Sequence, residues 1–127
     1  MEGNRVRVIC GPTAAGKSSI AATLALEYGA TIISADSRQI YKRFDIGTAK
    51  PDWSERKSIE HIGIDVAEPE ERFSASRWAA MAIDALAHIG GNAGVPLVVG
   101  GTGFYIRALF DPLFAAPDID ETRRKRL

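Results

Sequence analysis

The chain has 127 residues, of which 46% are apolar and 25% are charged, with 16 basic and 16 acidic residues. This composition is typical of one ordinary globular domain with a real core, and a formal net charge of zero gives no overall field that would attract nucleic acid. The sequence has no run of about 18 apolar residues, so it predicts no membrane span. The first residues also lack the apolar stretch of a signal peptide.

Cys10 is the only cysteine, which excludes an intramolecular disulfide and fits a protein of the reducing cytoplasm. It ends the first apolar run, Val6–Cys10, which we expect to be a strand. At that position we expect Cys10 to be buried as a small apolar residue.

A glycine-rich loop follows this strand and precedes an apolar helix predicted over Ile20–Leu26. Its sequence meets every constrained position of the phosphate-binding pattern G-x-x-x-x-G-K-[ST]: Gly11-Pro12-Thr13-Ala14-Ala15-Gly16-Lys17-Ser18. The two glycines let the backbone approach an anion closely, and the N–H groups at the helix start favour its charge. Lys17 supplies a cation for a terminal phosphate, and the Ser18 hydroxyl is a ligand for Mg²⁺. A chance match in an ordinary turn is the alternative, which the strand and helix context disfavours.

The second predicted strand, Thr31–Ala35, runs directly into the polar cluster Asp36-Ser37-Arg38-Gln39. Because Asp36 lies at a buried strand end, we interpret it as a general base or a group near Mg²⁺; the alternative is a helix cap. A loop is expected over 44–51, followed by a turn of helix over 53–58.

A third strand over His61–Val66 is weakened by Gly63. His61 has no second metal-binding residue at a suitable spacing, so we expect it to have a structural role.

The next part of the chain predicts a helix, a strand and a helix. Ser74 is expected to cap a helix that carries apolar residues at spacings of three and four and ends at Gly90-Gly91. Strand 96–99 leads into Gly100-Gly101-Thr102-Gly103, and an apolar helix is expected over Phe104–Phe110.

The last segment predicts one more helix, which starts near Asp118 or Asp120. It carries the basic run Arg123–Arg126, whose ordinary interpretation is a solvated face. Because this helix starts so close to the last residue, we expect the chain to be cut short.

Strands that alternate with helices predict an α/β protein with a mainly parallel sheet and helices on both faces. The polar clusters at 11–18, 36–39 and 100–103 each follow a strand, and should meet at the carboxyl edge of that sheet. The sequence contains no zinc-site spacing, no Ser-His-Asp set and no dinucleotide fingerprint. It also lacks an apolar strand ending in the hydrolytic carboxylate of an ATP-driven motor.

Four blocks of the sequence together resemble one family, tRNA dimethylallyltransferase, also called tRNA isopentenyltransferase or IPP transferase. They are Gly11–Ser18, Ile33–Tyr41, Asp45–Pro51 and Val99–Tyr105, in this order. The first block is shared by P-loop proteins at large, whereas Asp45–Pro51 has no such general meaning. The resemblance implies a P-loop-containing three-layer α/β fold, in which residues 1–127 are the P-loop core, the N-terminal part of a longer catalytic domain. The C-terminal part and an inserted helical domain would be absent, so we expect the fragment alone to bind anions without turnover.

The resemblance also implies a reaction, the transfer of a dimethylallyl group from its diphosphate to N6 of the adenine beside the anticodon of a tRNA. The partners would be dimethylallyl diphosphate, held by Gly11–Ser18, and the tRNA anticodon stem-loop, with Mg²⁺ on Ser18 as the cofactor. We expect a cytoplasmic monomer without a membrane partner.

The resemblance assigns roles residue by residue. Asp36 matches the catalytic aspartate that takes the proton from N6, and Thr102 lies where the family touches the target nucleotide. The implied tRNA contacts are Asp36, Ser37, Arg38, Gln39, Thr102 and Arg123, although a one-residue gap near Pro117 leaves Arg123 and Arg124 as alternatives. This match favours RNA contact over a solvated face for the terminal basic run.

One block departs from the family pattern. The family usually has His-His-Leu-x-Asp where this chain has His61-Ile62-Gly63-Ile64-Asp65, so no function is assigned to that strand. Two other interpretations remain open. One is a nucleotide kinase-like P-loop enzyme, which would use the loop on ATP, or an adenylate prenyltransferase, which would prenylate free AMP, ADP or ATP. The other is an inactive, truncated phosphate-binding module.

Overall fold

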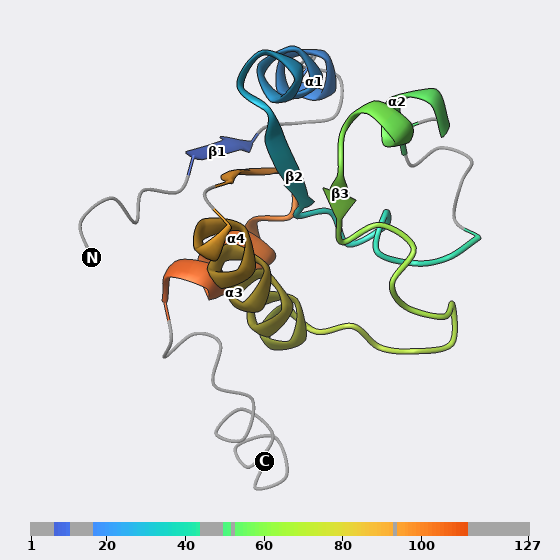
Figure 1. The fold of residues 1–127 in the computed structure, drawn as a ribbon. Coiled ribbons are helices and arrows are strands. Elements are labelled where there is room, and N and C mark those ends of the chain that lie inside the picture. Colours follow the sequence, from blue (N-terminus) through green and yellow to red (C-terminus); the bar gives the residue numbers. More distant parts are fainter. Residues whose placement is uncertain (1–6, 11–16, 44–49, 52, 93, 112–127) are drawn as a thin grey trace, which may run out of the picture.

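The computed structural model describes residues 7–10, 17–43, 50–51, 53–92 and 94–111, with the backbone alone for Lys17 and Ser18. Four strands alternate with four helices along this part of the chain (Figure 1). In chain order these are β1 (Arg7–Cys10), α1 (Lys17–Tyr28), β2 (Ala30–Ser34), α2 (Trp53–Ser58), β3 (His61–Ile62), α3 (Ala75–Gly91), β4 (Val95–Gly100) and α4 (Gly103–Phe110). Within the described ranges, none of the helices has the length and hydropathy needed to cross a membrane.

The four strands form one sheet in the order β1-β4-β2-β3, and all three neighbouring pairs are parallel, as predicted. β4 is inserted between β1 and β2, although it is the last strand along the chain. In register, Cys10 of β1 lies opposite Gly100, and Ser34 of β2 lies opposite Val99. Three strands therefore end side by side, and the segments that follow them begin at one edge of the sheet.

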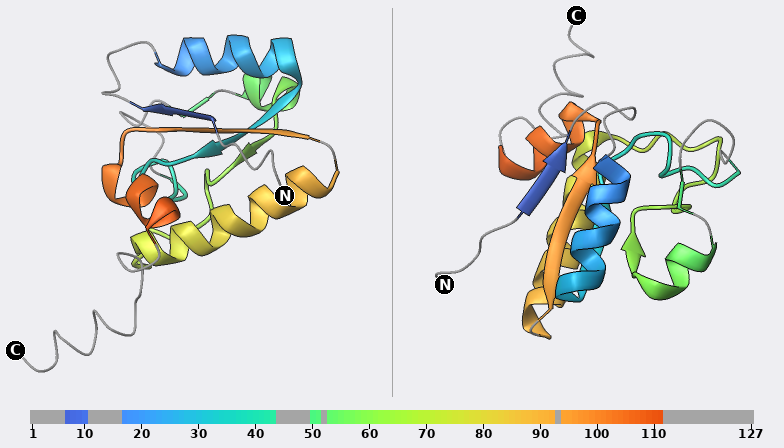
Figure 2. Two further views of the ribbon diagram at one scale, coloured as in Figure 1. Left: turned by 90° about the vertical axis from the view of Figure 1, so that its left-hand side faces the viewer. Right: turned by 90° about the horizontal axis from the view of Figure 1, so that it is seen from above.

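Helices cover both faces of the sheet, which makes the three layers that the sequence predicts (Figures 1 and 2). Because successive side chains of a strand point to opposite faces, neighbours in one strand enter different cores. Ile32 and Leu97 pack in the cluster under α1, where Ala21 of that helix is buried. Ile33 and Val98 pack in the larger cluster against α3 and α4.

The larger core contains a stacked aromatic pair whose polar atoms are all satisfied. Trp78 of α3 is fully buried, its ring stacks on Tyr105 of α4 at 5.3 Å, and its Nε1–H donates to the carbonyl of Ser34 at 2.8 Å. The Tyr105 hydroxyl donates to the carbonyl of Phe73 at 3.0 Å. Burial, with the nearby charges of Tyr41 and Asp36, raises the pKa of Tyr105 to about 12, so this hydroxyl remains a donor. The Trp78 bond joins α3 to the end of β2, and the ring stacking with the Tyr105 bond joins α4 to α3 and to the residue before the cap of α3.

Several local predictions are confirmed, and two are wrong. Ser74 caps α3 by accepting the Arg77 N–H at 3.2 Å, and this helix ends at Gly91. The third strand ends at Ile62 instead of Val66, because the backbone turns at Gly63, where φ is +94°. Cys10 is exposed instead of buried, because β1 lies at the edge of the sheet. The predicted helix after Asp118 lies outside the described residues.

Candidate functional site

The structure brings two of the predicted polar clusters together at the carboxyl edge of the sheet. The Ala35 N–H donates to the carbonyl of Val99 at 2.7 Å, and the Thr102 N–H donates back to the carbonyl of Ala35 at 3.1 Å. The Ser37 N–H then donates to Thr102 Oγ1 at 2.9 Å. Segments 65 residues apart in the chain are thereby joined directly, as the strand-end argument predicts.

Asp36 begins a turn over residues 36–41, which we call the Asp36 turn. Its Oδ1 accepts the N–H of Arg38 at 2.8 Å and that of Gln39 at 3.2 Å, while the Ile40 N–H donates to the Asp36 carbonyl at 3.2 Å. No helix follows Asp36 in the described residues up to 43, so the helix-cap alternative is wrong; Oδ1 instead accepts the N–H groups of a turn. Oδ1 thus orients the carboxylate, and among the described residues no group donates a hydrogen bond to Oδ2.

Thr102 occupies the N-cap position of α4, but its side chain does not cap that helix. Its hydroxyl instead reaches the Asp36 turn, accepting the Ser37 N–H and donating to Ser37 Oγ at 3.4 Å. The approach depends on Gly100, because a Cβ there would lie 2.2 Å from the carbonyl oxygen of Ala35. Only glycine permits this contact between the two strand ends.

Ser37, Arg38 and Gln39, which the sequence predicts to contact RNA, differ in their exposure to solvent. Ser37 and Arg38 are exposed, whereas Gln39 is half-buried and its Oε1 accepts the Ser34 hydroxyl at 2.9 Å. The first two are therefore accessible to a large partner, and the third ties the turn to β2.

Other predicted site residues lie outside the described residues. These are Gly11, Pro12, Thr13, Ala14, Ala15, Gly16 and Arg123, together with the side chains of Lys17 and Ser18. The described flanks fit the motif: β1 ends at Cys10 beside Gly100, and α1 begins at Lys17. Cys10, the last described residue before the motif, therefore lies next to the segment that carries Thr102.

Sequence reasoning gave no role to Lys50 or Asp65, which meet beside the Asp36 turn. Lys50 Nζ lies 2.6 Å from Asp65 Oδ1, and Arg56 Nη1 lies 3.2 Å from Asp65 Oδ2. Burial by itself would raise the pKa of Asp65, but the hydrogen bonds and charges of Lys50 and Arg56 outweigh it and lower that pKa. Lys50 stands in the matching block Asp45–Pro51, whereas Asp65 stands in the block that departs from the family pattern; their contact depends on the fold.

His61 has the structural role that the sequence predicts. Its Nδ1 lies 2.8 Å from the carbonyl of Ile59, so this nitrogen carries the proton, and Nε2 faces Glu55 at 3.7 Å. Burial lowers the pKa of His61, which keeps the ring neutral.

The one metal that the sequence predicts is Mg²⁺ on Ser18, whose side chain lies outside the described residues. In the described ranges no group of three or more His, Cys, Asp or Glu residues could hold a metal ion. Mg²⁺ is usually bound through one or two protein oxygens together with phosphates and water. A Ser18 hydroxyl and a diphosphate would supply ligands of this kind.

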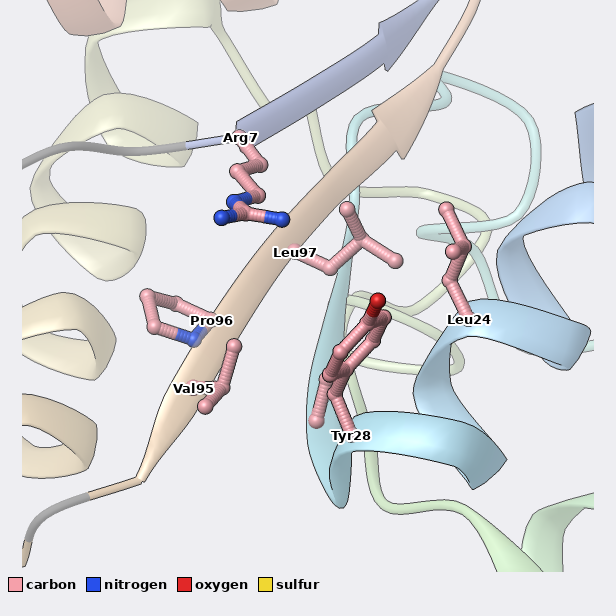
Figure 3. Close-up of a pocket in the computed structure, with 7 residues that line it drawn as sticks. Arg7, Leu24, Tyr28, Val95, Pro96 and Leu97 are labelled. Carbon is pink, nitrogen blue, oxygen red and sulfur yellow. The ribbon is translucent and has the colours of Figure 1, made fainter.

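A shallow apolar pocket lies at the opposite edge of the sheet, near the amino ends of the strands (Figure 3). Its walls include the first residues of β1 and β4 and the end of α1, with Arg7, Leu24, Tyr28, Val95, Pro96 and Leu97 labelled. The pocket shares no lining residue with the Asp36 turn or the Gly100–Thr102 segment, so it is not part of this site.

The parallel order of strands, the three layers and the motif after β1 define an α/β protein of the P-loop class. Within that class, the family model described as IPP transferase matches residues 39–127. The chain belongs to the IPP transferase family.

Known relatives agree with this assignment. The chain is 47% identical over 124 residues to a tRNA dimethylallyltransferase of Anaeromyxobacter sp., covering 98% of this chain and 41% of the relative. It is 48% identical to tRNA dimethylallyltransferase 1 of Syntrophotalea carbinolica, covering 94% and 38%. The chain thus spans about 40% of the length of these curated relatives.

Solved structures are similar to the same part of the fold. A tRNA isopentenylpyrophosphate transferase of Bacillus halodurans superposes with a TM-score of 0.79 at 37% identity, covering 84% of this chain and 35% of that one. The corresponding protein of Staphylococcus epidermidis gives a TM-score of 0.78 at 40% identity, covering 82% and 34%.

Proposed function

We propose that this chain is the N-terminal, P-loop part of a cytoplasmic, monomeric enzyme that transfers a dimethylallyl group to N6 of the adenine beside the anticodon in tRNA. The observation that carries the proposal is the direct bond between the Asp36 turn and Thr102, next to the strand that leads into the motif Gly11–Ser18. Membership of the IPP transferase family and the names of the relatives support the choice of substrates.

In the proposed reaction the C–O bond between the dimethylallyl C1 and the diphosphate breaks, and a bond forms between C1 and the adenine N6. Asp36 Oδ2 takes the proton that N6 loses, while the two N–H bonds to Oδ1 keep the carboxylate in place. The Thr102 hydroxyl, already bonded to the Asp36 turn, fixes the nucleotide beside this base. The exposed Ser37 and Arg38 would contact the RNA.

The leaving diphosphate gains negative charge as the C–O bond breaks. In our proposal the backbone N–H groups of Gly11–Ser18 and the Lys17 ammonium bind it and stabilise that charge. Mg²⁺, held by the Ser18 hydroxyl and the diphosphate, would supply further positive charge.

The decisive assay measures transfer of the labelled prenyl group to unmodified tRNA and, separately, to free AMP, ADP and ATP. A fusion protein supplies the length that the curated relatives have beyond this chain: residues 1–127 joined to the C-terminal part of the Anaeromyxobacter relative. Label on tRNA alone is expected, and label on free nucleotides alone would overturn the proposal in favour of an adenylate prenyltransferase. Residues 1–127 by themselves should bind diphosphate without turnover.

Asp36→Asn tests the general base within the same fusion protein. Asparagine keeps an oxygen for the N–H groups of Arg38 and Gln39 but removes the basic site, so kcat should fall about 100-fold or more. The dissociation constant for diphosphate should change less than about threefold, because a base acts mainly in the transition state. Equal losses of both would indicate a structural or metal-binding role.

A further inference from the structure

An ionic cluster of three residues lies on the β3 side of the Asp36 turn. Lys50 Nζ and Arg56 Nη1 contact the two carboxylate oxygens of Asp65, at 2.6 and 3.2 Å. The Lys50 side chain is only 6% exposed, which is unusual for lysine.

Both members of the closest pair also bond to the backbone of the Asp36 turn. Lys50 Nζ donates to the carbonyl of Tyr41 at 2.8 Å, and the Asp65 N–H donates to that of Gln39 at 3.0 Å. The Ile40 carbonyl, which lies between these two acceptors in the chain, accepts the N–H groups of Val66 and Ala67 at 2.8 and 2.9 Å. Three consecutive carbonyls at the end of the turn are therefore held from one side.

Stability alone is a weak explanation for this arrangement. Asp65 has φ +57°, in the left-handed region that non-glycine residues seldom adopt, and Lys50 is held away from water. Buried ion pairs are often no more stable than apolar residues of similar volume. A second ion pair, Lys42–Glu68 at 2.9 Å, already joins the end of the Asp36 turn to the segment after Asp65 at the surface.

We propose that Lys50 and Asp65 are positioning residues for the transfer reaction, which hold the Asp36 turn where Asp36 Oδ2 and the Thr102 hydroxyl face one substrate. This proposal rests on the proposed function. Neither residue contacts the reacting atoms; each acts through the carbonyls of the turn.

Lys50→Met in the fusion protein is the main test, with Lys42→Met as the matched control. Methionine keeps most of the apolar volume and removes the ammonium. Lys50→Met should lower kcat by about 10- to 100-fold, because small displacements of a reacting group have effects of this size. The KM for dimethylallyl diphosphate should change less than about threefold, because the proposal leaves the phosphate loop untouched. Lys42→Met should leave both values within about twofold.

A double-mutant cycle separates positioning from general stability. If Lys50 acts through Asp36, adding Lys50→Met to Asp36→Asn should cost little further activity, whereas a purely structural loss would add in full. Full additivity, or an unchanged kcat in folded Lys50→Met, would overturn the proposal. Near-UV circular dichroism checks that Lys50→Met is folded. If it is not, Asp65→Asn replaces it in the same double-mutant cycle with the same criteria, because asparagine keeps the side-chain volume and one oxygen.

Amide hydrogen exchange distinguishes this proposal from the proposed function. If the wild-type fusion protein transfers nothing to tRNA or nucleotides, the proposed function fails. Exchange of the Arg38 and Gln39 amides, which bond to Asp36, still reports the geometry of the turn. Faster exchange in Lys50→Met than in Lys42→Met is expected, and equal rates would overturn the positioning role.

Discussion

The Asp36 turn is held from two sides by different kinds of contact. On the β4 side the contacts are uncharged: Gly100 packs against the carbonyl of Ala35, and the Thr102 hydroxyl bonds to the backbone of Ser37. On the β3 side the nearest side-chain contacts are ionic, between Lys50, Asp65 and Arg56. One side therefore depends on backbone space, and the other adds charged side chains to its backbone hydrogen bonds.

Because of this difference, we expect substitutions and pH to affect the two sides of the Asp36 turn differently. A backbone contact fails when any side chain is added, at every pH. An ionic contact tolerates a change of shape better than a change of charge, and it weakens when its carboxylate is protonated.

Gly100→Ala should have the largest effect. The added Cβ would lie 2.2 Å from the Ala35 oxygen, so the strand ends must separate, and we expect a loss of about 3 kcal/mol or more in the free energy of unfolding. Urea denaturation measures it. Gly103→Ala is the control in the same loop, since a Cβ there meets nothing within 4 Å. Similar losses in the two variants would contradict the close-approach argument.

Asp65→Asn removes the negative charge on the β3 side and should lower the free energy of unfolding by about 2 kcal/mol at pH 6. The Asp65 side chain is 30% exposed, so we expect its ion pairs to lie between buried and surface pairs in strength. The pKa of Asp65 is lowered in the folded protein by Lys50 and Arg56, against the opposing effect of burial. As pH falls, the unfolded state therefore takes up the proton at a higher pH than the folded state does. The contribution of Asp65 to the free energy of unfolding is complete above the ordinary aspartate pKa and is lost as pH falls through the lower pKa of the folded protein.

Urea midpoints of the wild type and Asp65→Asn at several pH values check this prediction. The difference between the two proteins should be constant above about pH 5 and shrink below about pH 4. A difference that stays the same at low pH would mean that the charge of Asp65 is not what stabilises the turn.

Thr102→Val tests the uncharged contacts on the β4 side of the Asp36 turn. It removes the acceptor of the Ser37 N–H, and because Ser37 is exposed, water replaces part of the bond; we expect a loss of about 1 kcal/mol. In the fusion protein kcat should fall about tenfold, since the hydroxyl also positions the nucleotide in our proposal. Thr102→Ser keeps the hydroxyl and should retain most of the rate; equal rates for the two variants would remove Thr102 from the site.

Lys42→Met should have the smallest effect. Like Lys50–Asp65, the Lys42–Glu68 pair lies beside the end of the Asp36 turn, but both of its side chains are more than 40% exposed. Solvent and salt screen such a pair, so the urea midpoint should scarcely move, and any shift should vanish at about 0.5 M NaCl. A shift as large as that of Asp65→Asn would show that burial does not separate the two pairs.

Much of the fold could be predicted from local patterns. The Ser74 cap and the spacing of apolar residues predict α3 together with its end, and the alternation of apolar runs and helices predicts a parallel sheet. The exceptions depend on tertiary position. Cys10 is exposed because β1 is an edge strand, and the third strand is short because the chain turns at Gly63, where a Cβ would lie 2.8 Å from the Ser34 carbonyl.

The family and the residue types at the strand ends follow from the sequence alone, because a motif such as Gly11–Ser18 and a carboxylate after a buried strand are local features. Alternating strands and helices also predict that these strand ends share one edge, but which of them are direct neighbours follows from the strand order of the folded sheet. The insertion of β4 between β1 and β2 brings Thr102 to Ser37, and the turn after β3 brings Asp65 to Lys50. Such contacts follow from strand order and packing, which no single stretch of the chain encodes.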